Sequence, residues 1–190
     1  MDLLRKRISL EGKILGHGIL KVDSLINHQV DPELMNACGE EFAQLFGNIH
    51  ATRILTAEIS GIAPALMAAL HLHIPVVYAR KTRPITMPDT VYLTIAPSHT
   101  KGNMVELIVS PEYLQPNENV LIIDDFLATG ATIQGLVRLA QAAGAKVVGI
   151  GAMVEKTFEG GRESLGYLGV PIESLVKISS LDNNIIQFVD

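Results

Sequence analysis

Cysteine is nearly absent from this 190-residue sequence, which contains only Cys38. One thiol excludes an internal disulfide and any zinc site that is built from several cysteines. Cys38 lies at helical spacing from Leu34, Ala37 and Phe42, so we expect a small buried thiol rather than a nucleophile.

An excess of basic residues is also missing. Lys and Arg together number 15 against 20 Asp and Glu, which gives a formal net charge of −5. Non-specific binding to nucleic acid requires a basic face that neutralises phosphates, and the only basic cluster, residues 5–7, is short. We therefore expect no nucleic-acid partner.

The sequence has no long, uninterrupted hydrophobic run. The most apolar stretch, residues 62–79, contains Pro64, His71, His73 and Pro75, a pattern that a membrane span would not tolerate. The N-terminal residues contain no apolar run of signal-peptide length. With 48% hydrophobic and 18% charged residues, the composition supports a packed core. We expect a cytoplasmic protein without membrane contacts.

Strand and helix patterns alternate along the chain. Helical patterns occur at residues 64–72 and 133–143, and residues 31–33, Asp-Pro-Glu, are typical of a helix start. Short β-prone apolar runs occur at residues 53–57, 76–79, 120–123 and 146–154. This order predicts βαβ units and therefore an α/β fold with a mostly parallel, twisted sheet flanked by helices.

The alternation is interrupted between the second and third strands. Residues 91–95 and 104–109 predict the two arms of a β-hairpin within a flexible segment at about 82–110. We expect its tip, residues 98–103, to act as a lid that closes over a site. No linker or composition shift divides the chain, so we expect one domain over residues 1–190.

The most informative segment is VLIIDDFLATGAT, residues 120–132. Its four apolar residues predict a central strand whose carboxyl end presents Asp124 and Asp125, where open α/β sheets bind ligands. The small residues that follow turn directly into a helix, so backbone N–H groups and two hydroxyls would converge on a phosphate dianion. Each charge-assisted hydrogen bond there contributes about 1.5–3 kcal/mol. Because carboxylates repel phosphate, the acids would hold ribose hydroxyls or magnesium instead.

This order of strand, two acids, small loop and helix resembles the signature of the phosphoribosyltransferases that binds 5-phosphoribosyl-1-pyrophosphate (PRPP). The resemblance implies a type I phosphoribosyltransferase fold, with a small hood from about residues 1–30 and 155–190. Asp124 and Asp125 would be the catalytic residues at the ribose hydroxyls, and Mg²⁺ would be bound through PRPP, with no certain ligand from the protein. The implied 5′-phosphate loop comprises Ala128, Thr129, Gly130, Ala131 and Thr132.

A second strand-to-helix turn, AEISG at residues 57–61, resembles the pyrophosphate loop of the purine branch of this family. Ser60 stands where relatives of the adenine enzymes carry an arginine, so we expect backbone donors there instead of a guanidinium. Arg80 and Lys81 end the next strand and supply positive charge suited to the leaving pyrophosphate.

The residues that would select the base lie elsewhere. Lys156 ends the last long strand, and its ammonium can donate to an exocyclic oxygen but cannot accept from an amino group, which favours a 6-oxopurine over adenine. Phe126 or Phe158 could stack on the ring. Over its full length the sequence resembles bacterial family members that act on xanthine. This resemblance implies that Leu20, Asn27 and Lys156 bind xanthine.

The implied reaction is transfer of the phosphoribosyl group from PRPP to N9 of xanthine, in a homodimer that a guanine nucleotide could inhibit. Guanine and hypoxanthine stay open as acceptors. Two other classes also stay open: a regulator that senses PRPP without turnover, and a receiver-like domain that uses the acid pair for magnesium. A purine repressor of this kind would carry a basic DNA-binding domain, and a receiver would leave residues 128–132 unexplained.

Three other patterns carry no predicted chemistry. Gly16 and Gly18 lack the third glycine and the strand–helix context of a dinucleotide fingerprint. His71 and His73 are two residues apart, so a helix would not present both on one face as metal ligands. The sequence GGR at residues 160–162 predicts a turn.

Overall fold

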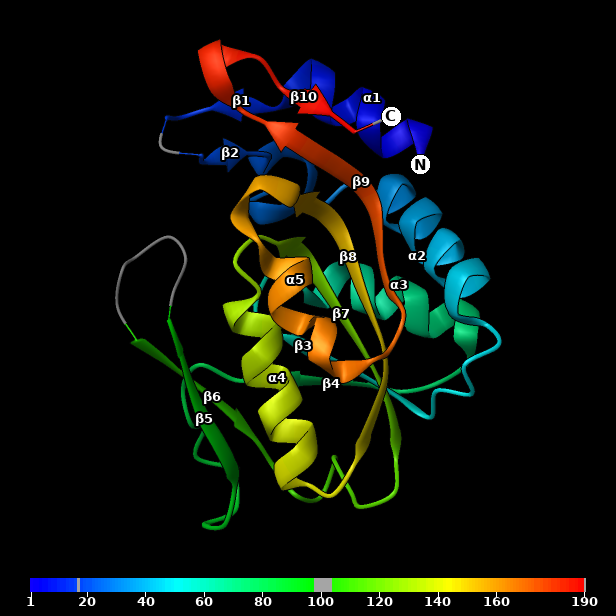
Figure 1. The fold of residues 1–190 in the computed structure, drawn as a ribbon. Coiled ribbons are helices and arrows are strands. Elements are labelled where there is room, and N and C mark those ends of the chain that lie inside the picture. The colour runs from blue at the N-terminus through cyan, green and yellow to red at the C-terminus, as the bar shows by residue number, and fades with distance from the viewer. Residues whose placement is uncertain (17, 98–103, 190) are drawn as a thin grey trace.

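The computed structural model describes residues 1–16, 18–97 and 104–189. At its centre is a six-stranded sheet in the order β10-β9-β8-β7-β3-β4, in which β10 is antiparallel and the other strands are parallel (Figure 1). The strands are β3 (Arg53–Ala57), β4 (Val76–Ala79), β7 (Asn119–Leu127), β8 (Lys146–Lys156), β9 (Ile172–Ser180) and β10 (Gln187–Phe188). The predicted α/β fold with a mostly parallel sheet is confirmed.

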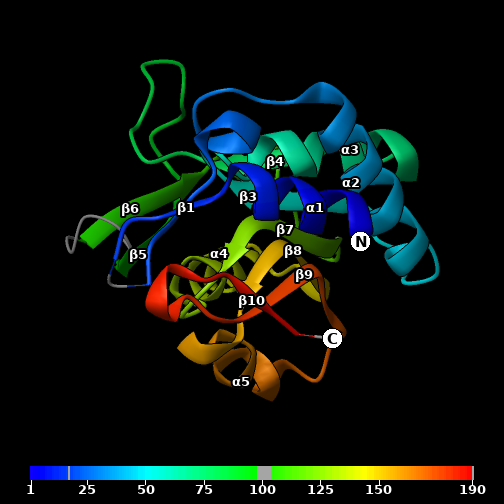
Figure 2. The ribbon, with the colours of Figure 1, turned by 90° about the horizontal axis from the view of Figure 1, so that it is seen from above.

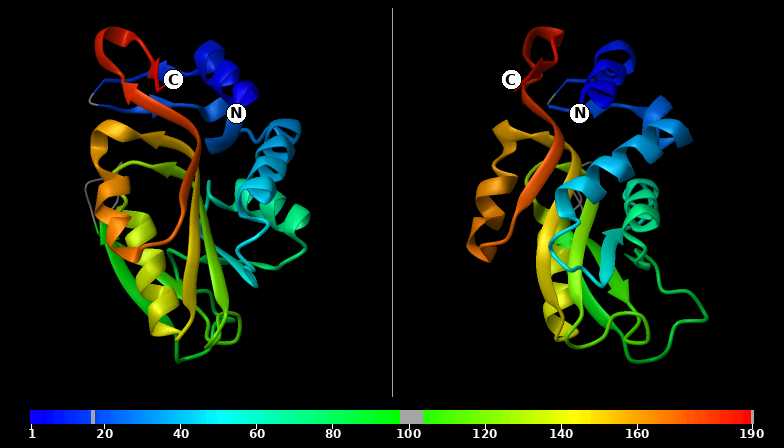
Figure 3. Two further views of the ribbon diagram at one scale, coloured as in Figure 1. Left: turned by 45° about the vertical axis from the view of Figure 1, so that its right-hand side comes forward. Right: turned by 90° about the vertical axis from the view of Figure 1, so that its right-hand side faces the viewer.

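Helices cover both faces of this sheet. α2 (Pro32–Phe46) and α3 (Ile62–Leu72) lie on one face, and α4 (Ala131–Ala142) lies on the other (Figure 3). Each face has its own apolar core: Leu121 and Ile123 of β7 pack toward α2 and α3, and the alternating residues Val120 and Ile122 pack with α4. Both faces of β7 are therefore covered, which explains why residues 120–123 are all apolar instead of alternating with polar residues.

The predicted helix positions agree with the structure. α2 begins after Asp31, whose carboxylate accepts a hydrogen bond from the Leu34 N–H at 3.0 Å and so caps the helix. Within α2, Cys38 is fully buried, as predicted, and burial raises the pKa of its thiol to about 12. In the described part of the chain, no helix is long and apolar enough to cross a membrane.

The predicted hairpin consists of β5 (Tyr92–Pro97) and β6 (Met104–Val109), paired antiparallel and packed against α4. Arg138 of α4 secures this contact, because its Nε donates to Thr94 Oγ1 and its Nη2 donates to the Ile95 carbonyl, both at 2.9 Å. The predicted lid, residues 98–103, lies outside the described residues, so its closure stays a prediction.

A layer built from both ends of the chain lies over the carboxyl end of the sheet (Figures 1 and 2). The N-terminal ammonium of Met1 donates to the Leu175 carbonyl at 2.9 Å, which ties the first residue to β9. This layer contains α1 (Asp2–Glu11), β1 (Lys13–Ile14), β2 (Leu20–Lys21), the π-helical turn η1 (Asp23–Asn27), η4 (Asp182–Asn184) and β10.

The segment between β8 and β9 differs from its prediction. It contains η2 (Thr157–Glu159), α5 (Gly161–Leu165) and η3 (Gly166–Leu168). Gly160 has a φ of +74° and turns the chain, but Gly161 and Arg162 already belong to α5. The predicted turn over residues 160–162 is therefore wrong for its last two residues. These residues are helical because Gly161 packs against the Ala128 carbonyl and Arg162 pairs with Glu155, contacts that the local sequence does not reveal.

The strand order reverses beside β3. β4 lies on one side of β3, and β7, β8 and β9 extend from the other side. The connections on either side of such a switch point diverge, which leaves a crevice at the carboxyl ends of β3 and β7.

Candidate active site

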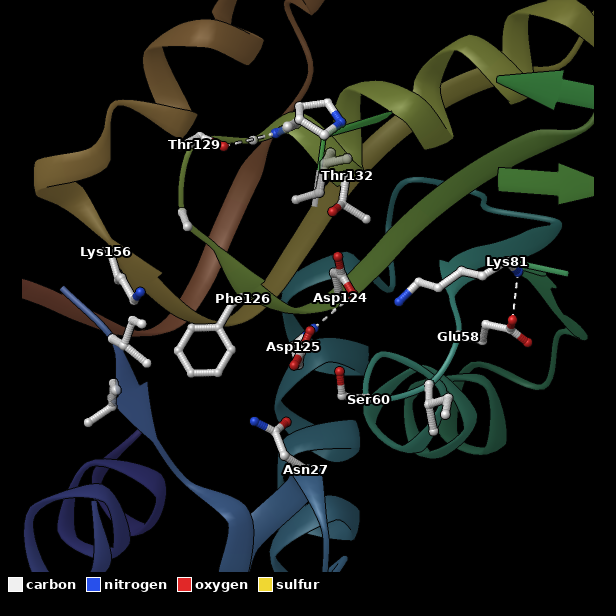
Figure 4. Close-up of a pocket in the computed structure, with 18 residues that line it drawn as sticks. Asn27, Glu58, Ser60, Lys81, Asp124, Asp125, Phe126, Thr129, Thr132 and Lys156 are labelled. Carbon is white, nitrogen blue, oxygen red and sulfur yellow. Dashed lines mark hydrogen bonds between the residues drawn. The ribbon is translucent and has the colours of Figure 1, made fainter. Parts of the chain in front are cut away.

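A cavity of about 520 Å³ opens at this switch point (Figure 4). It is lined by residues of β2 and η1, by the loops after β3 and β4, by the end of β5, by β7 with the turn into α4, and by the end of β8. Of the residues that the sequence predicts for the site, the cavity lining includes Leu20, Asn27, Ser60, Lys81, Asp124, Asp125, Ala128, Thr129, Gly130, Ala131, Thr132 and Lys156.

The two predicted acids have different environments. The sequence predicts that Asp124 follows the end of the strand. In the structure β7 extends to Leu127, so Asp124 lies within the strand and pairs with Ala152 of β8. Asp124 is 4% exposed, whereas Asp125 is half-buried. Burial, and then the charge of Asp125, raises the pKa of Asp124 well above its ordinary value. A hydroxyl donor or a cation in the cavity would compensate this unfavourable buried charge.

The turn from β7 into α4 has the properties of an anion site. Gly130 adopts a left-handed conformation with a φ of +82°, and within the described residues it gives α4 no side-chain cap. The first N–H groups of a helix have no intrahelical partner and lie at its positive end. Thr129 and Thr132 add hydroxyls to the lining (Figure 4). The turn can therefore bind a phosphate through backbone and hydroxyl donors.

Glu58 organises the opposite side of the cavity. Its Oε1 accepts a hydrogen bond from the Lys81 N–H at 2.6 Å, and its Oε2 lies 3.0 Å from Arg80 Nε. Figure 4 shows the Lys81 side chain extending from there toward Asp124. Arg80, which the sequence predicts for the pyrophosphate site, is not among the lining residues, because its guanidinium pairs with Glu58 and lies 5.9 Å from the Tyr78 ring.

Lys156 lies across the cavity from Lys81 (Figure 4). Its ammonium is buried and donates to the Gly18 carbonyl at 2.7 Å and to Glu159 Oε1 at 3.1 Å. It also lies 5.7 Å from the centroid of the Phe126 ring. Phe158, the other predicted stacking residue, does not line the cavity, so of the two predicted rings Phe126 is the one available to a flat ligand.

The acid pair does not by itself form a complete metal site. Among residues 1–16, 18–97 and 104–189, no cluster of three or more His, Cys, Asp or Glu could hold a metal ion. Asp124 and Asp125 provide the hard oxygen donors that Mg²⁺ prefers, but they leave most of its coordination positions open. The donors fit a magnesium ion whose other oxygens come from a bound substrate.

Comparison with known proteins decides the family. A family model described as "Phosphoribosyl transferase domain" matches residues 29–171. The chain belongs to the phosphoribosyltransferase family.

Two curated phosphoribosyltransferases illustrate the sequence similarity. The xanthine phosphoribosyltransferase of Leuconostoc mesenteroides is 47% identical over 189 residues, which cover 100% of both chains. The xanthine phosphoribosyltransferase of Shouchella clausii is 48% identical over 191 residues, covering 100% of this chain and 95% of that one.

Solved structures confirm the phosphoribosyltransferase fold that the sequence predicts. Adenine phosphoribosyltransferase from Thermoanaerobacter pseudethanolicus matches with a TM-score of 0.74 at 24% identity, over 92% of this chain and 99% of that one. The enzyme from Giardia lamblia, complexed with 9-deazaadenine, matches with a TM-score of 0.76 at 22% identity, over 93% of this chain and 98% of that one. At these identities the similarity establishes the fold alone.

Sequence reasoning missed several lining residues of this phosphoribosyltransferase. Ile19 and Ile59 line the cavity, and Ile59 is 79% exposed, but an isolated isoleucine in a loop gives no signal for a side-chain role. Glu58 and Ile59 belong to the predicted pyrophosphate loop at residues 57–61, but only Ser60 of that loop is predicted as a site residue. The role of the Glu58 carboxylate could have been considered, because it follows β3 directly at the carboxyl edge of the sheet.

Proposed function

We propose that this phosphoribosyltransferase transfers the 5-phosphoribosyl group of PRPP to N9 of xanthine, forming xanthosine 5′-monophosphate (XMP) and pyrophosphate in purine salvage. The observation that carries this proposal is the order of groups around one cavity. A helix turn with a glycine at its N-cap, an acid pair and a lysine beside an aromatic ring line it, and a second lysine lies opposite. The 45–48% identity to proteins named xanthine phosphoribosyltransferase supports the same substrate.

The phosphoribosyl group occupies the centre of the cavity in this proposal. The 5′-phosphate accepts hydrogen bonds from the backbone and hydroxyls of residues 128–132, and the ribose hydroxyls donate to Asp124 and Asp125. Lys81 and Ser60 contact the leaving pyrophosphate on the opposite side. Arg80 has no direct contact in this arrangement, since Glu58 holds its guanidinium.

The base lies between Phe126 and the residues of β2 and η1. The Lys156 ammonium has three N–H donors and uses two of them on Gly18 and Glu159, so one is left for a purine carbonyl. The Asn27 amide serves the 2-oxo edge, and Leu20 provides an apolar contact. An amino group at C6 offers Lys156 nothing to donate to, which disfavours adenine.

Catalysis results from positioning and electrostatics. The bond from ribose C1′ to pyrophosphate breaks with its electrons on oxygen, a bond forms from C1′ to N9, and the N9 proton passes to water. Positive charge develops on the ribose, beside the carboxylates of Asp124 and Asp125. When bound, Mg²⁺ neutralises charge on the pyrophosphate oxygens. Closure of the predicted lid, residues 98–103, which lie outside the described residues, would exclude water that hydrolyses the activated sugar.

The proposal includes a cytoplasmic homodimer. Leu66 and Leu70 expose apolar surface on α3, and Ile85 does so in the loop after β4, which supports association of two copies. A guanine nucleotide would compete for residues 128–132 and Lys156 and so inhibit the enzyme. Light scattering tests the dimer, and inhibition kinetics with GMP test the competition.

A PRPP-dependent assay with xanthine, guanine, hypoxanthine and adenine, with and without Mg²⁺, tests the function. We expect magnesium-dependent formation of XMP and no product from adenine. Preferred turnover of guanine or hypoxanthine would change the assigned base. PRPP binding without turnover of any base would favour the regulator, and labelling of an aspartate by acetyl phosphate would favour the receiver-like domain.

A further inference from the structure

Glu155 is a buried carboxylate that the proposed mechanism does not use. It immediately precedes Lys156 in β8 and is only 2% exposed. A carboxylate this deeply buried requires a partner of opposite charge. Arg162 of α5 supplies it in a two-point contact: Nε donates to Oε1 at 2.8 Å and Nη2 donates to Oε2 at 2.6 Å.

The same guanidinium joins three elements. Arg162 Nη1 donates to the carbonyl of Ile172, the first residue of β9, at 2.6 Å, and the Ser174 hydroxyl donates to Glu155 Oε2 at 2.6 Å. Burial alone would raise the pKa of Glu155, but the hydrogen bonds from Arg162 and Ser174 hold it below its ordinary value. The pair is therefore ionised at neutral pH, and it fixes α5 relative to β8 and β9.

The other side of α5 packs directly on the turn over residues 128–130. A Cβ at Gly161 would contact the Ala128 carbonyl oxygen and lie 2.9 Å from the Gly130 nitrogen, so only a glycine permits this approach. The Ser164 hydroxyl lies 3.3 Å from the carbonyl oxygen of Thr129, within hydrogen-bonding distance. The backbone of α5 thus forms the outer wall of the turn.

α5 is only five residues long, too short to be stable without tertiary contacts. Besides Ser164, two further side chains attach it to the protein: Leu165, which is fully buried, and Arg162, through the ion pair. Glu155 also pairs in register with Leu127, the last residue of β7 before the turn. The ion pair therefore fixes α5 next to the end of β7. Because α5 packs directly on residues 128–130, a small shift of α5 would move those residues.

We propose that the Glu155–Arg162 ion pair is a positioning element that holds α5 against residues 128–130 and keeps this turn in the conformation that binds the sugar phosphate. The inference rests on the proposed phosphate-binding role of residues 128–132. Arg162 does not line the cavity and contacts no substrate in this arrangement. A purely structural pair would stabilise the fold without affecting phosphate affinity, and the two roles are separable by experiment.

The test compares Arg162→Gln with Arg53→Gln. Arg53 also pairs with a glutamate, Glu118, but it lies at the amino end of β3, whereas the cavity lies beyond the carboxyl end of that strand. Ribose 5-phosphate is the probe, and its dissociation constant is measured by calorimetry well below each variant's unfolding temperature. The Michaelis constants for PRPP and xanthine are measured on the same samples.

We expect R162Q to raise the dissociation constant of ribose 5-phosphate about tenfold or more, while R53Q stays within about twofold of the wild type. The Michaelis constant for PRPP should rise much more than that for xanthine. Arg162→Lys, which keeps the charge but loses the two-point contact, should give an intermediate value. A lower unfolding temperature with unchanged ribose 5-phosphate affinity in R162Q would overturn the inference.

If R162Q does not fold, the double variant E155Q/R162Q replaces the pair by neutral amides and is measured in the same way. Unchanged affinity in that folded variant would equally overturn the inference. A wild-type protein that does not bind ribose 5-phosphate at all would instead contradict the proposed role of residues 128–132. The two failures are therefore distinguishable.

Discussion

The backbone N–H of Asp125 donates a hydrogen bond to Asp124 Oδ1 at 3.1 Å, so the two acids are joined locally although only Asp124 is fully buried. Ionisation of Asp124 is unfavourable because its carboxylate is removed from water, whereas the half-buried Asp125 lines the open cavity. We therefore expect the two acids to respond differently to the same substitution.

Asp124→Asn should stabilise the substrate-free protein at neutral pH by about 1–3 kcal/mol, because it removes a buried charge that the hydrogen bond from the Asp125 N–H compensates only in part. The pKa of Asp124 is raised above its ordinary value of 3.8, so the folded state binds the proton more tightly than the unfolded state does. Wild-type stability therefore falls as the pH rises above that ordinary value. The free energy of unfolding of D124N should therefore exceed that of the wild type by an amount that grows as the pH rises above this value. The difference should vanish at lower pH.

Denaturant unfolding of both proteins between pH 3 and pH 8 (roughly the range over which a carboxyl with a raised pKa titrates) measures this effect. Asp89→Asn is the matched control, because the Asp89 side chain is fully exposed and has no desolvation to relieve. An advantage of D124N that does not change with pH would contradict the assignment of the effect to ionisation of Asp124.

Asp125→Asn should lower kcat by about 100-fold, since the amide cannot stabilise the positive charge that develops on the ribose. Its backbone N–H is unchanged, so the hydrogen bond to Asp124 should persist and the fold should be retained. Steady-state kinetics and circular dichroism check both statements. Wild-type kcat in a folded D125N would remove Asp125 from the ribose site.

Lys156→Ala should raise the Michaelis constant for xanthine about tenfold or more and that for PRPP far less, because it removes a charged donor to the base. Lys81→Ala is the matched comparison, since Lys81 lies across the cavity and should affect PRPP more than xanthine (Figure 4). The assay measures both constants for both variants. Equal changes in the two constants for K156A would place Lys156 outside the base site.

Gly61→Ala should lower kcat/KM about 100-fold, because a shifted acid misplaces the ribose. A Cβ at Gly61 would lie 2.5 Å from Asp124 Oδ1 and would also contact the Thr56 hydroxyl, so the carboxylate must move. Gly166→Ala is the control: nothing lies within 4 Å of its added Cβ, and its φ of −58° suits alanine. Full activity in G61A would show that the position of Asp124 is unimportant.

The parts of the fold that the sequence predicts are those governed by local patterns. β3 and β4 have the predicted bounds, because short apolar runs in a parallel sheet that helices cover on both faces leave little choice of conformation. β7 extends past its predicted end through Asp124 and Asp125, because pairing with β8 outweighs the low strand propensity of aspartate. The sequence therefore misses how deeply Asp124 is buried.

The site is predicted where contacts lie within one segment and missed where distant segments meet. Residues 128–132 can be assigned from the strand, loop and helix that contain them. The contact of Gly161 with Ala128 joins residues far apart in sequence, and GGR alone predicts only a turn. The position of Arg80 outside the cavity lining is hard to predict for the same reason, since its pairing with Glu58 depends on how β3 and β4 end beside each other.

A crystal structure with bound XMP tests the central claim most directly. We predict that the phosphate lies against the backbone of residues 128–132, the ribose hydroxyls against Asp124 and Asp125, and the purine against Phe126 and Lys156. A phosphate bound anywhere else, with residues 128–132 free of ligand, would contradict the account.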